Sequence, residues 1–196
     1  MPEGDQYLEK YASVSSIVKQ TLPLLVICVI LGLFAGVVLG GMKASLEALP
    51  GLLVLVPAIL DTRGNIFGAF GSRLGSALHQ GLILPELERD DNLMHSIAAA
   101  LGEGVIISIV LAVIAHYVIL ALGRDSIGII PLTAISLIAG VVSGIVLTGL
   151  IILLAFAGYN KGIDPDNITG PIATTAGDVL AMLALFMAAE IVLGAI

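Results

Sequence analysis

Five long apolar stretches dominate this sequence and restrict what it can fold into. The first, residues 20–42, contains no charged side chain. Because a helix rises about 1.5 Å per residue, this stretch is long enough to cross the roughly 30 Å hydrocarbon core of a bilayer. Four further stretches have spanning length, and they cover residues 48–84, 95–122, 127–158 and 167–194. We therefore predict an all-α membrane protein with five transmembrane helices.

The composition excludes several classes of protein. Only 12% of the residues are charged and 58% are hydrophobic, so an ordinary soluble domain is excluded. The net charge of −7 argues against a nucleic-acid partner. The single cysteine, Cys28, lies in an apolar run, so we expect neither a disulfide nor a thiolate metal site. We expect a multi-pass protein of the cell membrane, surrounded by the lipid bilayer.

The basic residues near the span ends predict the orientation. Cytoplasmic loops are enriched in Lys and Arg, which favours the cytoplasmic side for the N-terminus and the outside for the C-terminus. The inner side then carries Lys10, Lys19, Arg89 and Lys161, and the outer side carries Lys43 and Arg124.

Ahead of the spans, residues 5–19 place apolar side chains at helical spacing. We predict that residues 1–19 form an amphipathic N-terminal segment with a short interfacial helix, ahead of the five-span domain over residues 20–196. Packing of the same residues as the first turn of the bundle is the alternative.

Two acids interrupt the apolar stretches, and they point to a polar path through the membrane. An ionised carboxylate at the centre of a membrane helix costs ~3 kcal/mol or more, so Asp61 and Asp178 must face a partner or a polar pathway. Asn65 lies one helical turn after Asp61 on the same face. Thr174 and Thr175 lie one turn before Asp178 on a shared face.

Carboxylate, amide and hydroxyl oxygens are hard ligands. They suit Mg²⁺, which keeps much of its water and takes few direct protein ligands. Pro171 lacks a backbone N–H, so it also frees a carbonyl one turn earlier in its helix. Soft ligands are not grouped, which disfavours copper and thiolate zinc. The pattern predicts a metal site for a transported Mg²⁺ ion, with no organic cofactor, formed by Asp178, Asp61, Asn65, Thr174 and Thr175.

Other interpretations of these residues stay open at this point. In one interpretation Asp61 pairs with an arginine, because buried charges are usually paired. Arg63 itself lies roughly on the opposite side of the helix. In another, the threonines bond to carbonyls of their own helix and Asp178 is neutral. An aspartyl protease dyad is disfavoured, because Thr175-Ala176-Gly177-Asp178 lacks the first glycine of the Gly-x-Gly-Asp pattern. We therefore do not expect an enzyme.

Small residues recur every four positions on three of the spans. Such ladders let helix backbones approach closely, so we predict tight packing inside the bundle, with a dimer face as the alternative. The runs 35–40 and 139–144 are also alike, and each precedes a span with an early proline and a later acid. This pattern suggests an inverted repeat. The ladders are Gly32, Gly36, Gly40; Gly64, Gly68, Ser72, Ser76; and Gly140, Gly144.

Three runs carry a resemblance to a known family: residues 56–65, 162–167 and 170–179. There the chain resembles the membrane domain of the MgtE family of magnesium channels and transporters. It is also similar to the related eukaryotic magnesium solute carriers, each half of which corresponds to one such domain. The resemblance implies a homodimer with the ion path along its axis, Asp178 as the central acid, and backbone oxygen from the Thr174 region.

The sequence departs from the bacterial members in two places. Gly170 stands before Pro171 where bacterial members carry a polar side chain, and the bacterial Gly-Gly-Asn-x-Gly-Asn-Gln pattern is reduced to Arg63-Gly64-Asn65. We expect transport of a divalent cation, Mg²⁺ first and Ca²⁺, Mn²⁺ or Co²⁺ as alternatives. A membrane scaffold subunit that does not transport is the alternative from another class.

Overall fold

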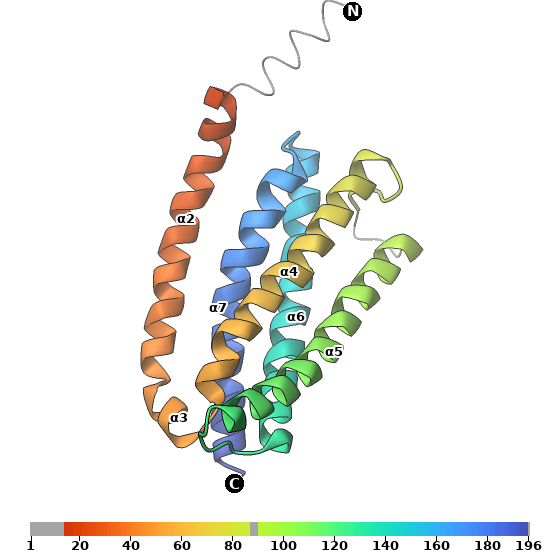
Figure 1. Cartoon of the computed structure of the whole chain (residues 1–196). Coiled ribbons are helices and arrows are strands. Elements are labelled where there is room, and N and C mark those ends of the chain that lie inside the picture. The colour runs from red at the N-terminus through yellow and green to blue at the C-terminus, as the bar shows by residue number, and fades with distance from the viewer. Residues whose placement is uncertain (1–13, 87–89, 196) are drawn as a thin grey trace, which may run out of the picture.

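The structure is a computed structural model, and it describes residues 14–86 and 90–195. Over these residues the protein is all-α, as predicted (Figure 1). Five of its helices are long and apolar enough to cross a membrane, which agrees with the five predicted spans. They are α2 (Val14–Gly41), α4 (Leu52–His79), α5 (Asp91–Ala121), α6 (Ile129–Asn160) and α7 (Pro165–Leu193).

A short helix that the sequence pattern did not predict, α3 (Lys43–Ala48), connects α2 to α4. Gly51 ends this connection with a φ of 102°, a left-handed conformation that favours glycine. A Cβ at Gly51 would also lie 2.5 Å from the side chain of Ile119 on α5. The long apolar stretch 48–84 is therefore one helix, α4, with turns at both ends.

The start of α7 follows from its sequence. Asp164 is the N-cap residue, its side chain accepts a hydrogen bond from the backbone N–H of Asp166, and Pro165 is at the first helical position. An N-cap carboxylate satisfies a backbone donor that has no partner within the helix, and proline has no N–H to leave unsatisfied there. The predicted helix start at Asp164-Pro165 is confirmed.

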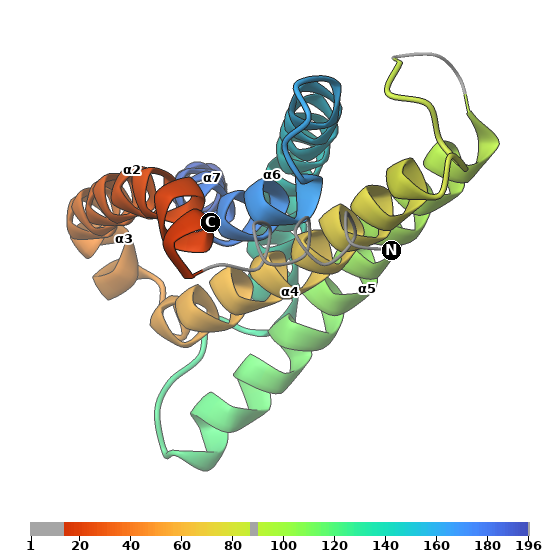
Figure 2. The same cartoon turned by 90° about the horizontal axis from the view of Figure 1, so that it is seen from above.

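Helix α7 lies at the centre of the bundle. It packs against α6, α4 and α2, whereas α5 packs against α4 and α6. From above, α2 stands on one side of α7, and α5 lies beyond α4 (Figure 2). The antiparallel helices α4 and α7 meet along three glycines. A Cβ at Gly64, Gly71 or Gly75 would lie 3.4, 2.8 or 2.6 Å from an atom of Thr174, Thr169 or Asp166, respectively.

The prediction of tight packing holds for only some of the glycine ladders. It is confirmed at Gly140 and Gly144, where an added Cβ would meet Ser108 and Phe67. On α2 it is wrong, because no atom lies within 4 Å of a Cβ built at any of the three positions, Gly32, Gly36 and Gly40. Helix α2 packs mainly against α7 and leaves most of its surface exposed. Its glycine ladder therefore does not contact another of the described helices of the same chain.

Most of the predicted N-terminal segment, residues 1–13, lies outside the described residues. Its last residues, 14–19, continue directly into α2 as one helix. The boundary proposed between residues 19 and 20 therefore falls inside a helix. The division into a segment 1–19 and a domain 20–196 stays a prediction.

Candidate metal centre

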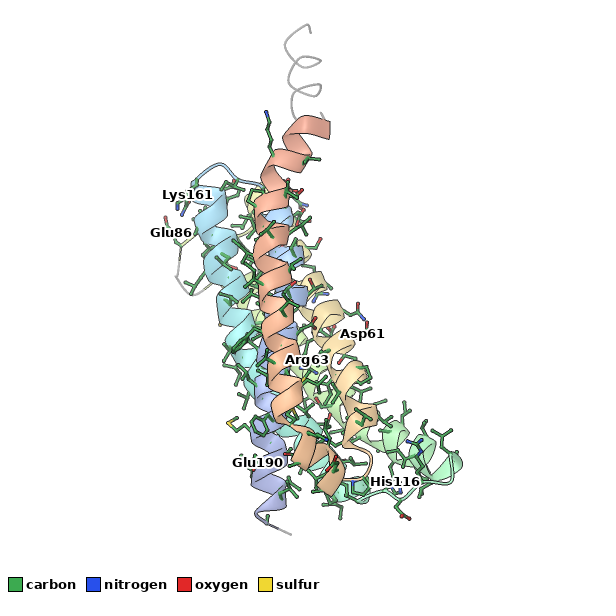
Figure 3. All side chains as sticks on the ribbon, turned by 90° about the vertical axis from the view of Figure 1, so that its left-hand side faces the viewer. Asp61, Arg63, Glu86, His116, Lys161 and Glu190 are labelled. Carbon is green, nitrogen blue, oxygen red and sulfur yellow. The ribbon has the colours of Figure 1, made fainter. Side chains whose placement is uncertain are left out.

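Asp61 lies on the outer side of α4, near the middle of the molecule. Its exposed carboxylate accepts a hydrogen bond of 3.0 Å from Nδ2 of Asn65, one turn later on the helix. Figure 3 shows Asp61 projecting away from the bundle, between the end that carries Lys161 and the end that carries Glu190. The alternative in which Asp61 pairs with an arginine is wrong for the described residues, because no arginine there forms an ion pair with Asp61. The guanidinium of Arg63 points into the bundle and donates to the carbonyl of Gly140.

The second group of predicted ligands lies on α7. Thr174 is exposed, while Thr175 and Asp178 are half-buried. The hydroxyl of Thr174 donates to the carbonyl oxygens of Pro171 at 3.0 Å and of Gly170 at 3.3 Å. The bonding of threonine within its own helix, one of the alternatives, therefore occurs at Thr174. A hydroxyl that donates its hydrogen still has oxygen lone pairs for a cation.

The structure brings the α4 and α7 groups together. Gly64 packs against Thr174, and the two helices run in opposite directions. Asp61 lies one turn before Gly64 on α4, and Asp178 lies one turn after Thr174 on α7. The two acids therefore lie at the same level of the bundle. Asp61 and Asp178 thus face the same stretch of the α4–α7 contact. Like charges held together in this way favour a cation between them.

The surroundings of the α4–α7 contact differ between its two ends. Toward the start of α7, exposed Asn65, Ser72 and Ser76 on α4 lie on the helix face of Asp61. Toward α3, the two helices pack through a buried apolar cluster that includes Leu55, Ile59, Met182 and Leu185. At the far end of this cluster the hydroxyl of Ser45 on α3 donates to Glu190 on α7 at 2.6 Å. The exposed face of α4 is thus mostly polar between Asp61 and the start of α7.

The donor set consists of a few hard oxygen ligands. Within residues 14–86 and 90–195, no group of three or more His, Cys, Asp or Glu side chains is placed to hold a metal ion. Two carboxylates with neighbouring amide and hydroxyl oxygens suit a cation that keeps part of its water, as Mg²⁺ does. The site residues fit such an ion better than a fully dehydrated or thiolate-bound metal.

Two contacts beside these residues were not predicted from the sequence. The thiol of Cys28 on α2 lies 3.7 Å from the carbonyl oxygen of Pro171, which places α2 against α7 one to two turns from Asp178. Arg63 is almost fully buried. The sequence pattern predicted only that its side chain lies on the side of the helix roughly opposite Asp61. Both contacts join helices far apart in the chain, so no local signal in the sequence could have predicted them.

Five helices of spanning length and apolar composition define a multi-pass membrane protein. Comparison with known families agrees with this class. The sequence model of the MgtE family, described as a divalent cation transporter, matches residues 56–188. This match covers most of the chain and includes all five predicted ligands, and the chain belongs to the MgtE family.

Individual relatives point in the same direction. Solute carrier family 41 member 2 of Gallus gallus is 30% identical over 138 residues, and that of Homo sapiens is 27% identical over 148 residues. Solute carrier family 41 member 3 of Rattus norvegicus is 25% identical over 134 residues. These alignments cover 68%, 68% and 67% of this chain but only 24%, 24% and 29% of those proteins. The chain thus spans about a quarter of the length of the curated relatives that it matches.

Proposed function

We propose that this protein moves Mg²⁺ across the cell membrane, with Asp61 and Asp178 as the central acids of the path. The observation that carries the proposal is that these two acids lie at the same level on antiparallel, closely packed helices. An intramembrane acid is costly unless it serves a pathway or a partner, and no arginine or lysine in the described residues pairs with either acid. Asn65, Thr174 and Thr175 supply further oxygens to a partly hydrated ion.

Two chains form the complete path in this proposal. In one copy, Asp61, Asn65, Ser72 and Ser76 are exposed on a helix of spanning length. Lipid offers these groups no hydrogen-bond partner, so they need water or protein against them. A second copy related by a two-fold axis would place the same face of α4 opposite itself and enclose a polar path.

The orientation belongs to the same proposal. With the N-terminus in the cytoplasm, the polar stretch of α4 from Asn65 to Ser76 lies toward the cytoplasm, and the apolar barrier formed by the buried cluster beside α3 lies toward the outside. Glu86 and Lys161 then lie at the cytoplasmic end, and His116 and Glu190 lie at the outer end (Figure 3). Passage of an ion requires the apolar barrier to open.

Binding of Mg²⁺ to the purified protein tests the proposal. A ligand that binds only the folded state stabilises it by RT ln(1 + [L]/Kd), about 2.7 kcal/mol at one hundred times Kd. We expect a saturable rise in the unfolding temperature with Mg²⁺ that Na⁺ at equal ionic strength does not reproduce. Asp178→Asn should abolish the rise. Titrations with Ca²⁺, Mn²⁺ and Co²⁺ rank the alternative ions, and no rise with any divalent cation would favour the scaffold alternative.

Disulfide cross-linking tests the second copy. In a Cys28→Ala background, Ser72→Cys should form a cross-linked dimer rapidly in bilayers, because the proposed axis brings the two α4 faces together. Ala98→Cys is the matched control, since residue 98 is also exposed and lies at a similar depth on α5. Equal cross-linking rates at positions 72 and 98 would contradict a dimer built on α4.

A further inference from the structure

Arg63 is a buried cation with no acidic partner. Only 1% of the residue is exposed, and none of the described carboxylates forms an ion pair with it. Its Nη1 donates to the carbonyl of Gly140 at 3.0 Å, and its Nη2 lies 3.5 Å from both the carbonyl of Gly104 and the hydroxyl of Ser108. Its buried Nε has no hydrogen-bond partner. A guanidinium stays charged in proteins, so a full positive charge sits inside the bundle.

The neutral surroundings of Arg63 account for only part of this arrangement. Two carbonyl dipoles and a hydroxyl face the guanidinium, and its Cζ lies 5.9 Å from the centroid of the Phe67 ring. Removal of a cation from water without an anionic partner is expensive, and replacement by an apolar side chain is often neutral or stabilising. Stability alone is therefore a poor explanation for a charge at this position.

The Cβ end of Arg63 lies beside the two acids, and its guanidinium extends from there toward α5 and α6. Asp61 is two positions earlier on α4 and projects outward, whereas Arg63 lies toward the middle of the bundle (Figure 3). The Cβ of Arg63 also lies 3.9 Å from a Cβ built at Gly177, the neighbour of Asp178 on α7. Arg63 is thus adjacent in the structure to both acids, although it bonds to neither.

The charges of the three side chains have a simple sum. Asp61 and Asp178 contribute two negative charges and Arg63 contributes one positive charge, which leaves −1 in each chain. In the proposed dimer the total is −2, the charge that one Mg²⁺ balances. Without Arg63 the dimer would carry −4 within the membrane, which a single divalent cation does not neutralise.

We propose that Arg63 is a positioning residue whose fixed charge sets the cation affinity of the Asp61–Asp178 site. It lowers the affinity enough for the ion to leave, and it matches the site to one divalent cation per dimer. This inference rests on the proposed function, because it takes the two acids as the cation site. Arg63 does not touch the ion and acts through the potential at the two carboxylates.

Paired substitutions test the charge separately from the packing. Arg63→Gln removes the charge, whereas Arg63→Lys keeps it and loses the planar fork. Through an effective dielectric constant of about 20, a unit charge about 12 to 24 Å from a divalent ion changes its affinity on the order of ten- to hundredfold. We expect Arg63→Gln to bind Mg²⁺ tighter by that factor and to transport more slowly, and Arg63→Lys to resemble the wild type. Merely structural damage would weaken binding instead.

A double substitution supplies the sharper test. Asp61→Asn should weaken Mg²⁺ binding, and the addition of Arg63→Gln restores −1 in each chain and should bring the affinity back toward the wild-type value. Arg124→Gln, an exposed arginine in the loop before α6, serves as a control for lost positive charge. Affinities come from Mg²⁺-dependent thermal stabilisation, and transport comes from flux into liposomes.

The possible outcomes separate this inference from the proposed function. If the wild type shows no Mg²⁺ dependence, the proposed function fails. If the wild type and Asp178→Asn behave as expected but Arg63→Gln binds no tighter, or the double substitution recovers nothing, only the role of Arg63 is overturned. Arg63→Met fills a similar volume and replaces Arg63→Gln if the latter does not fold. Failure of both neutral variants to fold while Arg63→Lys folds would assign the charge to folding and overturn the inference.

Discussion

Replacement of Asp178 by asparagine is expected to reduce Mg²⁺ flux by more than about a hundredfold while the protein stays folded. Two unit charges 4 Å apart interact by about 4 kcal/mol at an effective dielectric constant of 20, and the ion carries two charges. Asparagine has the same shape but no charge to balance a partly hydrated Mg²⁺. Because the shape of the side chain is unchanged, the packing of α7 and the stability of the protein should be unchanged as well.

The measurement is Mg²⁺ uptake into liposomes that contain the purified variant, with unfolding temperature and elution volume as checks on folding. Asp125→Asn is the control, because Asp125 is an exposed acid in the loop before α6 and lies outside helices α4 and α7. It should transport like the wild type. Unchanged uptake by Asp178→Asn would remove Asp178 from the path.

Replacement of Asp61 by asparagine is expected to have a smaller effect, a reduction in Mg²⁺ affinity of about tenfold. Asp61 is more exposed than Asp178, and one of its oxygens already accepts a hydrogen bond from Asn65. Water therefore screens its charge more strongly. The amide in its place still presents an oxygen to the ion.

The concentration dependence of flux distinguishes this effect from general damage. In Asp61→Asn the half-saturating Mg²⁺ concentration should rise while the maximal rate stays within a few-fold of the wild type. Asp61→Glu keeps the charge and should shift the half-saturating concentration less. If the two variants shift it equally, the charge of Asp61 is not what the ion senses.

The number of spans and several helix ends could be predicted from the sequence because they depend on local chemistry. An apolar run as long as residues 20–42 favours a helix that crosses a membrane. An Asp-Pro pair such as Asp164-Pro165 favours the start of a helix, with Asp as the N-cap. Helix α3 was missed because six residues between two spans give no period that can be detected.

The packing partners of small residues could not be predicted in this way. The four-residue spacing on α4 suggested Gly64, Gly68, Ser72 and Ser76 as one contact row. In the structure α4 meets α7 through Gly64, Gly71 and Gly75, and a Cβ at Gly68 would have nothing within 4 Å. Spacing shows which residues share a helix face, but only the arrangement of the whole bundle decides which face another helix covers.

In the candidate site, too, contacts along one helix could be predicted from the sequence and contacts between helices could not. Asp61 with Asn65, and Thr174 with Asp178, are neighbours along their helices, so the sequence alone placed each group on one face. Their meeting across α4 and α7 depends on the close approach at Gly64. The burial of Arg63 depends on carbonyls of α5 and α6, far away in the chain.

We expect the dimer to bind one divalent cation at Asp61 of α4 and Asp178 of α7, on the path that the two chains enclose. Anomalous diffraction from crystals grown with Mn²⁺, an oxygen-seeking ion that scatters anomalously, locates the ion directly. The account predicts a peak between the two carboxylates, within reach of a direct or water-mediated contact to each, that is absent in Asp178→Asn. A peak bound elsewhere in the membrane region, with none at this pair, would contradict it.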